Sequence, residues 1–459
     1  RQPRSTLFPY TTLFRSIARQ GVKILRASIS VAPSQKPVVK EAWLQDPTTL
    51  AVSFSEPVYT GKLKASLKPE LGLQSASLSG QAMKLLLKLK QPVTGPVKLT
   101  LENITDLAQR PNKLDKITVE IAPVSWPVSN QGLVFLFEKG ASKNLVTDPE
   151  TGQQLSYPLQ PRGLGHMDHN WALVLARGAY KVEGAGQRLL EACKASGQLT
   201  IETVLVPNNI TQTGPARIVT LSANPGERNF TLGQDGDHLV LRLRTPATGP
   251  NGANPQVPFG KLVAGQPTHV VITYTPGRLA AFIKGAKVLD TDAVQGDFSN
   301  WTPYELLLGD EATGDRDWAG TLSHVALYAH ALPDDMALQA SGYLPSGAEV
   351  AASKVRAKLL SRSDLPTLKQ ILPYRGALVN CEFEVLETLS GKPLSGKIRI
   401  AQWSLLDGNQ LALAPDRPGQ EAVLTIEPYQ ANPQLESILL SDTLEADWEV
   451  PQYYDVNPG

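Results

Sequence analysis

The sequence predicts an all-β protein built from several domains, and three observations support this. The chain has 459 residues, which corresponds to about three domains at about 150 residues each. Its 36 prolines and 36 glycines separate short apolar runs, a pattern typical of strands joined by turns. The clearest stretch runs from Thr268 to Tyr328 and predicts the back half of an antiparallel β-sandwich.

Bulk composition excludes several classes of protein. Hydrophobic residues make up 42% and charged residues 19% of the chain, as in ordinary globular proteins. The net charge of +1 gives no electrostatic reason to expect a nucleic acid or an anionic membrane as partner. No apolar run reaches the length of a membrane span. Cys193 and Cys381 fall in different predicted domains, so they predict neither a disulfide framework nor a metal knuckle.

The first residues are excluded from the fold prediction. Thr6–Ser16 reads TLFPYTTLFRS, which is what a widely used sequencing adapter gives when translated in one frame. We therefore interpret residues 1–16 as an artefact, with a genuine amphipathic segment as the alternative. Residues 17–36 then represent a strand and linker from a truncated upstream region, which would also have carried any signal peptide.

Residues 37–123 alternate short apolar runs with turns, which predicts a small β-sandwich. Leu50–Val58 (LAVSFSEPV) and Ile104–Ala108 (ITDLA) resemble two motifs of bacterial Ig-like domains of the surface-layer type. The sequence departs from that family at Gln109-Arg110, where Gly-Asn is usual. The resemblance implies a spacer domain.

Residues 124–345 are predicted to form the central module. His238–Arg244 has leucines at alternate positions, as in a strand with one buried face. Further along, Thr275-Pro276-Gly277 turns one strand into the next, and Gly285 permits a second reversal. Pro333-Asp334-Asp335 then predicts the start of a short helix, because proline and acidic residues favour a helix N-terminus.

The order of these pieces resembles a concanavalin A-like, or laminin G-like, jelly roll. The segments that carry the resemblance follow one another as the family's motifs do: Gly197–Val204, Pro267–Tyr274, Leu279–Gly285 and Trp318–Leu332. The sequence departs from the family at Pro267, where tryptophan is usual. The resemblance implies a jelly-roll sandwich on an extracytoplasmic protein (secreted, periplasmic or cell-surface), and a platform for ligands rather than one particular ligand.

Two regions follow the central module. Residues 346–372 are rich in Ala, Lys and Ser and are interpreted as a helix and linker. Residues 373–459 predict a small β-barrel, OB-like, with an extended acidic tail. The tail holds Trp448, Tyr453 and Tyr454, for which packing on the barrel is favoured over binding a partner.

Two passages of the central module, Phe298–Tyr304 and Gly309–Trp318, combine the residue types of a sugar site. Flat aromatic rings stack on sugar faces, and nearby amides and carboxylates hydrogen-bond hydroxyls or hold Ca²⁺. The alternative is that the tryptophans pack beneath the loop and the acidic side chains are only solvated. The candidate ligand-binding residues are Asn300, Trp301, Tyr304, Asp310, Asp315, Asp317 and Trp318.

Two further motifs suggest a metal only superficially. Gln234–Asp237 lacks the further acidic residues of a calcium loop, so a turn between two strands is favoured. His166–His169 has ligand-like spacing without a third nearby partner, so solvated loop histidines are favoured. The interpretation therefore requires no cofactor, although Ca²⁺ would suit the sugar site.

The sequence favours a non-catalytic binding, adhesion or scaffold protein, with a polysaccharide or another glycan as the ligand of the central module. The alternative is a polysaccharide-active enzyme, because glycoside hydrolases and lyases share this jelly roll. Hydrolases on this fold carry paired carboxylates on one strand, and no such spacing occurs in residues 124–345. A third interpretation is an accessory part of a larger enzyme whose catalytic domain lies upstream.

Overall fold

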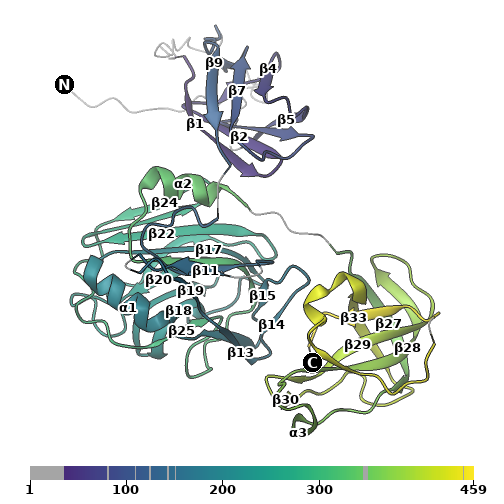
Figure 1. The fold of residues 1–459 in the computed structure, drawn as a ribbon. Helices are drawn as coiled ribbons and strands as arrows, with labels where there is room; N and C mark the ends of the chain where they lie inside the picture. The colour runs from purple at the N-terminus through teal and green to yellow at the C-terminus, as the bar shows by residue number, and fades with distance from the viewer. Residues whose placement is uncertain are drawn as a thin grey trace, which may run out of the picture.

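The computed structural model describes residues 36–79, 82–108, 110–123, 126–141, 144–149, 151–344, 350–447 and 449–458. These residues form three β-rich bodies in chain order, so the predicted all-β, multidomain architecture is confirmed (Figure 1). Among the described residues, no helix is long and apolar enough to cross a membrane. The adapter-like segment and residues 17–35 lie outside the described residues.

The N-terminal body is a β-sandwich with a single core. One sheet has the order β1-β2-β6-β5 and the other β4-β7-β9, and β3 pairs with β8. Leucines at alternate positions of β6 and β7 point into the core between the sheets. Whether this sandwich is Ig-like stays a prediction. Its strands are β1 Val39–Asp46, β2 Thr49–Phe54, β3 Val58–Tyr59, β4 Lys64–Lys68, β5 Leu73–Ser79, β6 Lys84–Leu89, β7 Val97–Glu102, β8 Thr105–Asp106 and β9 Ile117–Ile121.

The central body is a sandwich of two large antiparallel sheets. The eight-stranded sheet has the order β14-β15-β26-β17-β22-β23-β24, with β10 also paired to β26. Its strands are β10 Leu133–Glu138, β14 His166–Met167, β15 Leu173–Val174, β17 Leu199–Pro207, β22 Thr268–Thr275, β23 Arg278–Ile283, β24 Ala286–Thr291 and β26 Gly320–Tyr328. A separate hairpin pairs β11 Leu145–Thr147 with β12 Gln154–Ser156.

The second, seven-stranded sheet has the order β13-β16-β25-β18-β19-β20-β21. Its strands are β13 Leu159–Gly163, β16 Gly178–Val182, β18 Ala216–Asn224, β19 Glu227–Asp235, β20 His238–Leu243, β21 Val257–Lys261 and β25 Glu305–Leu308. The helix α1, Ala185–Ser196, which the sequence analysis did not predict, contributes Leu189, Leu190 and Cys193 to the core between the sheets.

The predicted hairpins are confirmed, and turn chemistry explains them. Thr275 pairs with Arg278 across Pro276 and Gly277, and Gly277 has a φ of +83°. Proline presets the first turn position, and glycine accepts the positive φ of the second. Ile283 then pairs with Ala286, and both intervening residues have positive φ, as a two-residue hairpin loop demands.

The outer face of the eight-stranded sheet is covered by apolar residues. Helix α2, Asp334–Gly342, begins after Pro333 as predicted. Its Ala337 and Ala340 pack with Val271 and Phe282 of the sheet in one buried cluster. Trp126 packs against the same cluster from the segment that precedes β10. This face is therefore occupied by the chain itself.

The C-terminal body is the predicted small barrel, closed by five strands in the order β28-β29-β33-β31-β27, with β27 pairing back to β28. They are β27 Ser353–Arg362, β28 Ala377–Ser390, β29 Gly396–Leu406, β31 Glu421–Pro428 and β33 Gln452–Asp455. Short elements complete it: α3 Leu368–Ile371, β30 Asn409–Gln410, η1 Tyr429–Ala431, η2 Pro433–Leu435 and β32 Leu439–Ser441. Whether the barrel is OB-like stays a prediction.

The helix predicted at the start of residues 346–372 is wrong, although the short helix α3 lies at the end of that range. Residues 353–362 form β27, a barrel strand, so the predicted boundary at 373 falls inside the barrel. Val355, Ala357 and Leu359 alternate with charged residues and point into the barrel core. This two-residue period marks a strand, whereas Ala, Lys and Leu are common in helices.

The aromatic residues of the tail pack on the barrel where the structure describes them. Tyr454 on β33 is buried, and its hydroxyl accepts a hydrogen bond from Trp403 Nε1 at 2.8 Å. Tyr453 is half-buried against the barrel core. Trp448 lies outside the described residues.

The barrel rests against the β14–β15 hairpin of the central domain. The His166 ring lies 6.3 Å from that of Trp403, and His169 Nδ1 lies 3.2 Å from Glu427 Oε2. Gly163 N donates to Asp407 Oδ2 at 3.2 Å. The prediction of solvated histidines is therefore wrong, because both rings are largely enclosed by this contact.

We predict that Leu359→Ala destabilises the barrel by about 2–5 kcal/mol, because it removes a fully buried side chain and leaves a cavity. Thermal unfolding of the full chain measures this as a lowered midpoint for the barrel. Lys354→Ala on the same strand is the control, because its side chain is exposed. Similar midpoints for the two variants would contradict the assignment of β27 to the barrel core.

We also predict that Trp301→Ala destabilises the central domain by about 3–5 kcal/mol, because its ring is only 2% exposed. Trp171→Ala in the same domain is the control, since Trp171 is 37% exposed. Denaturant unfolding of the two variants gives the comparison. A Trp301→Ala protein with wild-type stability would show that this ring contributes nothing to the core.

Candidate functional site

The outer face of the seven-stranded sheet differs in chemistry from that of the eight-stranded sheet. Thr220 on β18 pairs with Thr231 on β19, which pairs with Arg242 on β20. These residues alternate with core residues such as Leu221 and Phe230, so their side chains point away from the core. This face therefore carries hydroxyl and guanidinium groups, whereas the other sheet packs Val271 and Phe282 under α2.

The candidate residues of the first passage surround a buried tryptophan. Trp301 packs on Phe298 with ring centroids 4.2 Å apart, and its Nε1 donates to Arg244 O at 2.8 Å. Arg244 Nη1 donates to the Tyr304 hydroxyl at 3.2 Å. Asn300 has a buried Oδ1 without a hydrogen-bond partner among the described residues.

The second passage is a loop held in shape by one carboxylate. Asp310 Oδ1 accepts hydrogen bonds from Glu311 N at 2.6 Å and from Arg316 N at 2.8 Å. Burial raises the pKa of the Asp310 carboxyl. Trp318 closes the loop from below: it is fully buried, and its Nε1 donates to Gln234 Oε1 at 2.7 Å.

The same loop presents polar groups to solvent. Asp315 and Asp317 are exposed, and Thr313 Oγ1 donates to Asp315 Oδ1 at 2.6 Å. Arg316 Nη1 donates to Asp315 O at 2.7 Å, and about a third of the Arg316 side chain is exposed. The base of the loop is therefore held by hydrogen bonds, and its solvent-exposed surface is polar.

The structure divides the seven candidate residues into two groups. Asn300, Trp301 and Tyr304 precede β25, whereas Asp310, Asp315, Asp317 and Trp318 follow it, so the groups lie at opposite ends of that strand. Both tryptophans are buried. A buried ring cannot stack on a sugar, so for Trp301 and Trp318 the structure supports the packing alternative.

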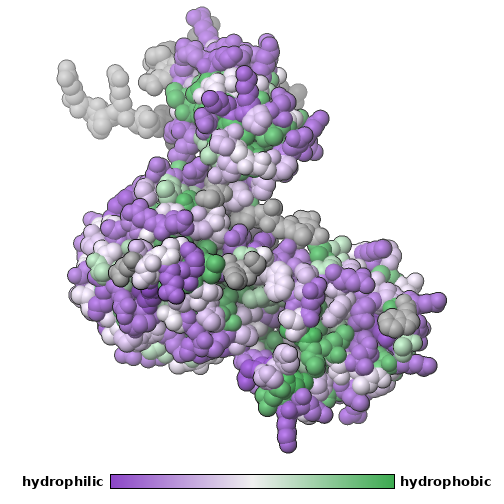
Figure 2. Space-filling view, viewed as in Figure 1, coloured by the Kyte–Doolittle hydropathy of each residue, from purple (hydrophilic) through white to green (hydrophobic). Residues whose placement is uncertain are grey.

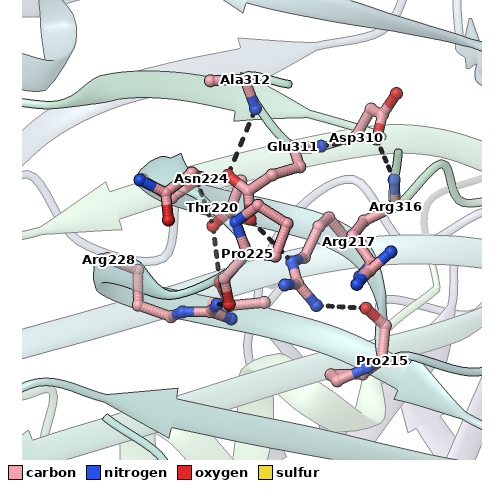
Figure 3. Close-up of polar contacts among 12 residues, drawn as sticks. Pro215, Arg217, Thr220, Asn224, Pro225, Arg228, Asp310, Glu311, Ala312 and Arg316 are labelled. Atoms are coloured by element: carbon pink, nitrogen blue, oxygen red, sulfur yellow. Dashed lines mark hydrogen bonds and ion pairs between the residues drawn. The ribbon is translucent and has the colours of Figure 1, made fainter. Parts of the chain in front are cut away.

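Sequence reasoning missed the buried polar residues beside the second group. Arg217 Nε donates to Glu311 Oε2 at 3.1 Å, and both side chains are fully buried (Figure 3). Ser222 Oγ also donates to Glu311. A bulge between Arg217 and Val219 breaks the alternation of β18, and Glu311 is 94 residues away in sequence. No pattern in the sequence around either residue therefore indicated this contact.

A second polar cluster lies under α2. Glu202 Oε1 contacts His269 Nε2 at 3.1 Å, and the Tyr328 hydroxyl donates to Glu202 Oε2 at 2.7 Å. His269 Nδ1 lies 2.7 Å from Tyr343 O, and burial lowers the pKa of neighbouring His324 to about 3. All four side chains are closed to solvent. The cluster therefore joins the sheet to the segment after α2 and offers no access to a substrate.

No metal centre is evident in the part of the chain that the structure describes: it contains no group of three or more His, Cys, Asp or Glu side chains able to hold an ion. Gln234–Asp237 is the turn between β19 and β20, as predicted. Gly236 supplies its positive φ of 63°.

Comparisons with solved structures found proteins of low similarity to this chain. One solved structure similar to this chain is domain 4 of AbnA, a GH43 extracellular arabinanase from Geobacillus stearothermophilus, in complex with arabinotriose. It is 16% identical, with a TM-score of 0.32, over 45% of this chain and 98% of that one. The botulinum neurotoxin serotype D/C VPI 5993 binding domain is 8% identical, with a TM-score of 0.36, over 65% and 74% of the two chains.

A Trypanosoma rangeli sialidase in complex with 2,3-difluorosialic acid is 15% identical, with a TM-score of 0.33, over 48% of this chain and 33% of that one. TM-scores this low give no information on the ligand of the present chain. The search of curated proteins found no match. The family model described as the concanavalin A-like lectin/glucanases superfamily matches residues 184–336, which include most strands of both large sheets. The central body is therefore a concanavalin A-like domain, matched by this family model over residues 184–336.

Proposed function

We propose that the central domain binds carbohydrate and that the protein is a non-catalytic, extracytoplasmic binding or scaffold protein. The observation that carries this proposal is the loop from Gly309 to Trp318. Its shape is fixed by the Asp310 carboxylate and the buried Trp318, while Thr313, Asp315 and Arg316 face solvent.

Such a loop suits saccharide recognition for a physical reason. Sugar hydroxyls both donate and accept hydrogen bonds, so they pair well with a surface that offers hydroxyl, carboxylate and guanidinium groups together. A surface already held in its bound shape loses little conformational entropy on binding. The visible surface of the central domain is mostly polar, whereas apolar residues gather on the barrel (Figure 2).

The neighbouring loop extends the same surface. Gln212, on the connection between β17 and β18, donates from Nε2 to Ala319 O at 2.9 Å and accepts from Ala319 N at 2.6 Å. Thr211 and Thr213 on either side of it are exposed. The connection around Gln212 and the loop from Gly309 to Ala319 are therefore hydrogen-bonded to each other, and together they form one polar rim at the same end of the sandwich.

The enzymatic alternative needs a pair of carboxylates set for acid–base catalysis, and Asp315 and Asp317 are the exposed acidic residues of the loop. Among the described residues of the rim, Asp310 holds backbone amides and Glu311 pairs with Arg217, so both are engaged in structure. Release of reducing sugars from a polysaccharide panel would instead support a hydrolase, and release of unsaturated products a lyase.

We predict that the full chain retains at least one polysaccharide in a pull-down or glycan array, tested with and without Ca²⁺. We expect Asp310→Ala to weaken that binding at least tenfold, because the loop loses two hydrogen bonds to a carboxylate, each contributing about 1.5–3 kcal/mol. Affinity electrophoresis measures the change.

Asp297→Ala is the matched control. Asp297 also accepts a backbone hydrogen bond within a loop, from Ser299 N at 3.0 Å, but it lies before β25, away from the rim. Glycan binding by the Asp297→Ala variant should stay within twofold of that of the wild type. Failure of the wild-type chain to retain any glycan, with or without Ca²⁺, would overturn the proposed function.

A further inference from the structure

Two arginines are buried on adjacent strands of the seven-stranded sheet. Arg217 on β18 and Arg228 on β19 are both fully buried on the outer face of the seven-stranded sheet. Burial of a charged group is costly unless it is paired and hydrogen-bonded. If every N–H group of the two arginines had a hydrogen-bond partner within the protein, a purely structural role would explain them.

The hydrogen bonds of these arginines are incomplete. Arg217 donates from Nε to Glu311 and from Nη1 to Pro215 O, but its Nη2 has no partner among the described residues. Arg228 donates from Nη2 to Pro225 O, and its buried Nε is also without a partner in the described part of the chain. Figure 3 shows both guanidinium groups and Glu311 in the same region.

Four arginine side chains gather here, and Glu311, Asp315 and Asp235 are carboxylates near them. Arg242 donates from Nε to the neutral Gln256 at 2.6 Å, and Arg316 carries a further buried Nε without a partner in the described residues. Burial, followed by the charges of Arg217 and Arg242, lowers the pKa of Arg228 to about 9. Glu311 is the carboxylate that contacts Arg217 directly, and Asp315 contacts Arg316.

The chemistry of the missing partner follows from the donors. Guanidinium groups present planar N–H pairs that match the oxygens of a carboxylate or sulfate, and charge-assisted bonds of this kind are short and strong. Arg242 and Arg316 are partly exposed, so the cluster reaches solvent beside the rim that we propose binds saccharide.

We propose that Arg217, Arg228, Arg242 and Arg316 form a receptor for an oxyanion carried by an acidic saccharide. The oxyanion is the carboxylate of a uronate-type sugar or a sulfate ester. Arg316 and Arg242 contact it at the rim, and the buried Arg217 and Arg228 contribute their charge from behind. The inference rests on the proposed carbohydrate binding and names the class of carbohydrate.

The test uses the full chain in affinity electrophoresis against four polymers. Polygalacturonate offers carboxylates, heparin offers sulfate esters together with carboxylates, and dextran and arabinan are neutral. We expect retention at least tenfold stronger on one or both acidic polymers than on the neutral ones. Retention should fall at least tenfold in Arg316→Gln and also with rising NaCl, since salt screens exposed charges.

Arg278→Gln is the matched control, because it removes the same charge from an exposed arginine on the other sheet, paired with Asp290 and Asp334. Arg242→Gln gives a second partly exposed site, and the thermal midpoint of each variant shows that it is folded. An equal loss in Arg278→Gln would reduce the effect to general charge attraction and overturn the inference.

The remaining outcomes are distinct. Stronger retention on polygalacturonate assigns a carboxylate, whereas retention on heparin alone assigns a sulfate ester. Equal binding of neutral and acidic polymers, unaffected by Arg316→Gln, overturns the oxyanion receptor and leaves the proposed function intact. Retention on none of the four polymers overturns the receptor, and a broader glycan panel then decides the proposed function separately.

Discussion

The central domain depends on one strand, β26. Gly320–Tyr328 pairs with β17 along nearly its whole length and also with β10 and β15. Its inward residues Leu322, Val325 and Leu327 belong to the core between the two sheets. The strand begins directly after the polar rim loop and leads into α2. Its register therefore fixes both the candidate site and the element that covers the opposite face.

Both flanking domains contact this framework through tryptophans. Trp43 of the N-terminal sandwich lies against Gly285 and Gly342, and a Cβ at Gly342 would come within 2.5 Å of Trp43 Nε1. Trp403 of the barrel lies beside His166. The glycines permit a close approach that any larger residue would prevent. Trp43 thus meets the central sandwich at the β23–β24 turn and the end of α2, whereas Trp403 meets it at β14.

Local signals explain which parts of the fold could be predicted. The hairpins around Pro276 and Gly285 follow from turn chemistry that acts over a few residues. The strand β27 was missed because Lys, Ala and Leu favour a helix, although Val355, Ala357 and Leu359 recur with a period of two. Helix α1 was missed because glycine at Gly184 and Gly186 weakens its start.

The candidate site was harder to predict, because residue type does not reveal the direction of a side chain. Trp301 and Trp318 have the chemistry of sugar-stacking residues, yet each directs its indole N–H to an internal acceptor. Arg217 and Glu311 meet only because a bulge and a returning loop bring them together. Pairing of this kind arises from the tertiary structure, so no pattern in either segment announces it.

The same reasoning explains why the arginines point to a ligand rather than to stability. A sheet face needs no buried charge to pack, and apolar residues of similar volume stabilise a protein at least as well as buried ion pairs. The opposite sheet packs Val271 and Phe282 under α2, and its buried Glu202 is paired on both oxygens, with His269 and Tyr328. Arg217 and Arg228 instead keep buried N–H groups without partners among the described residues. An anionic group bound by the partly exposed Arg242 and Arg316 would offset the charge of this buried pair, which a neutral saccharide could not do.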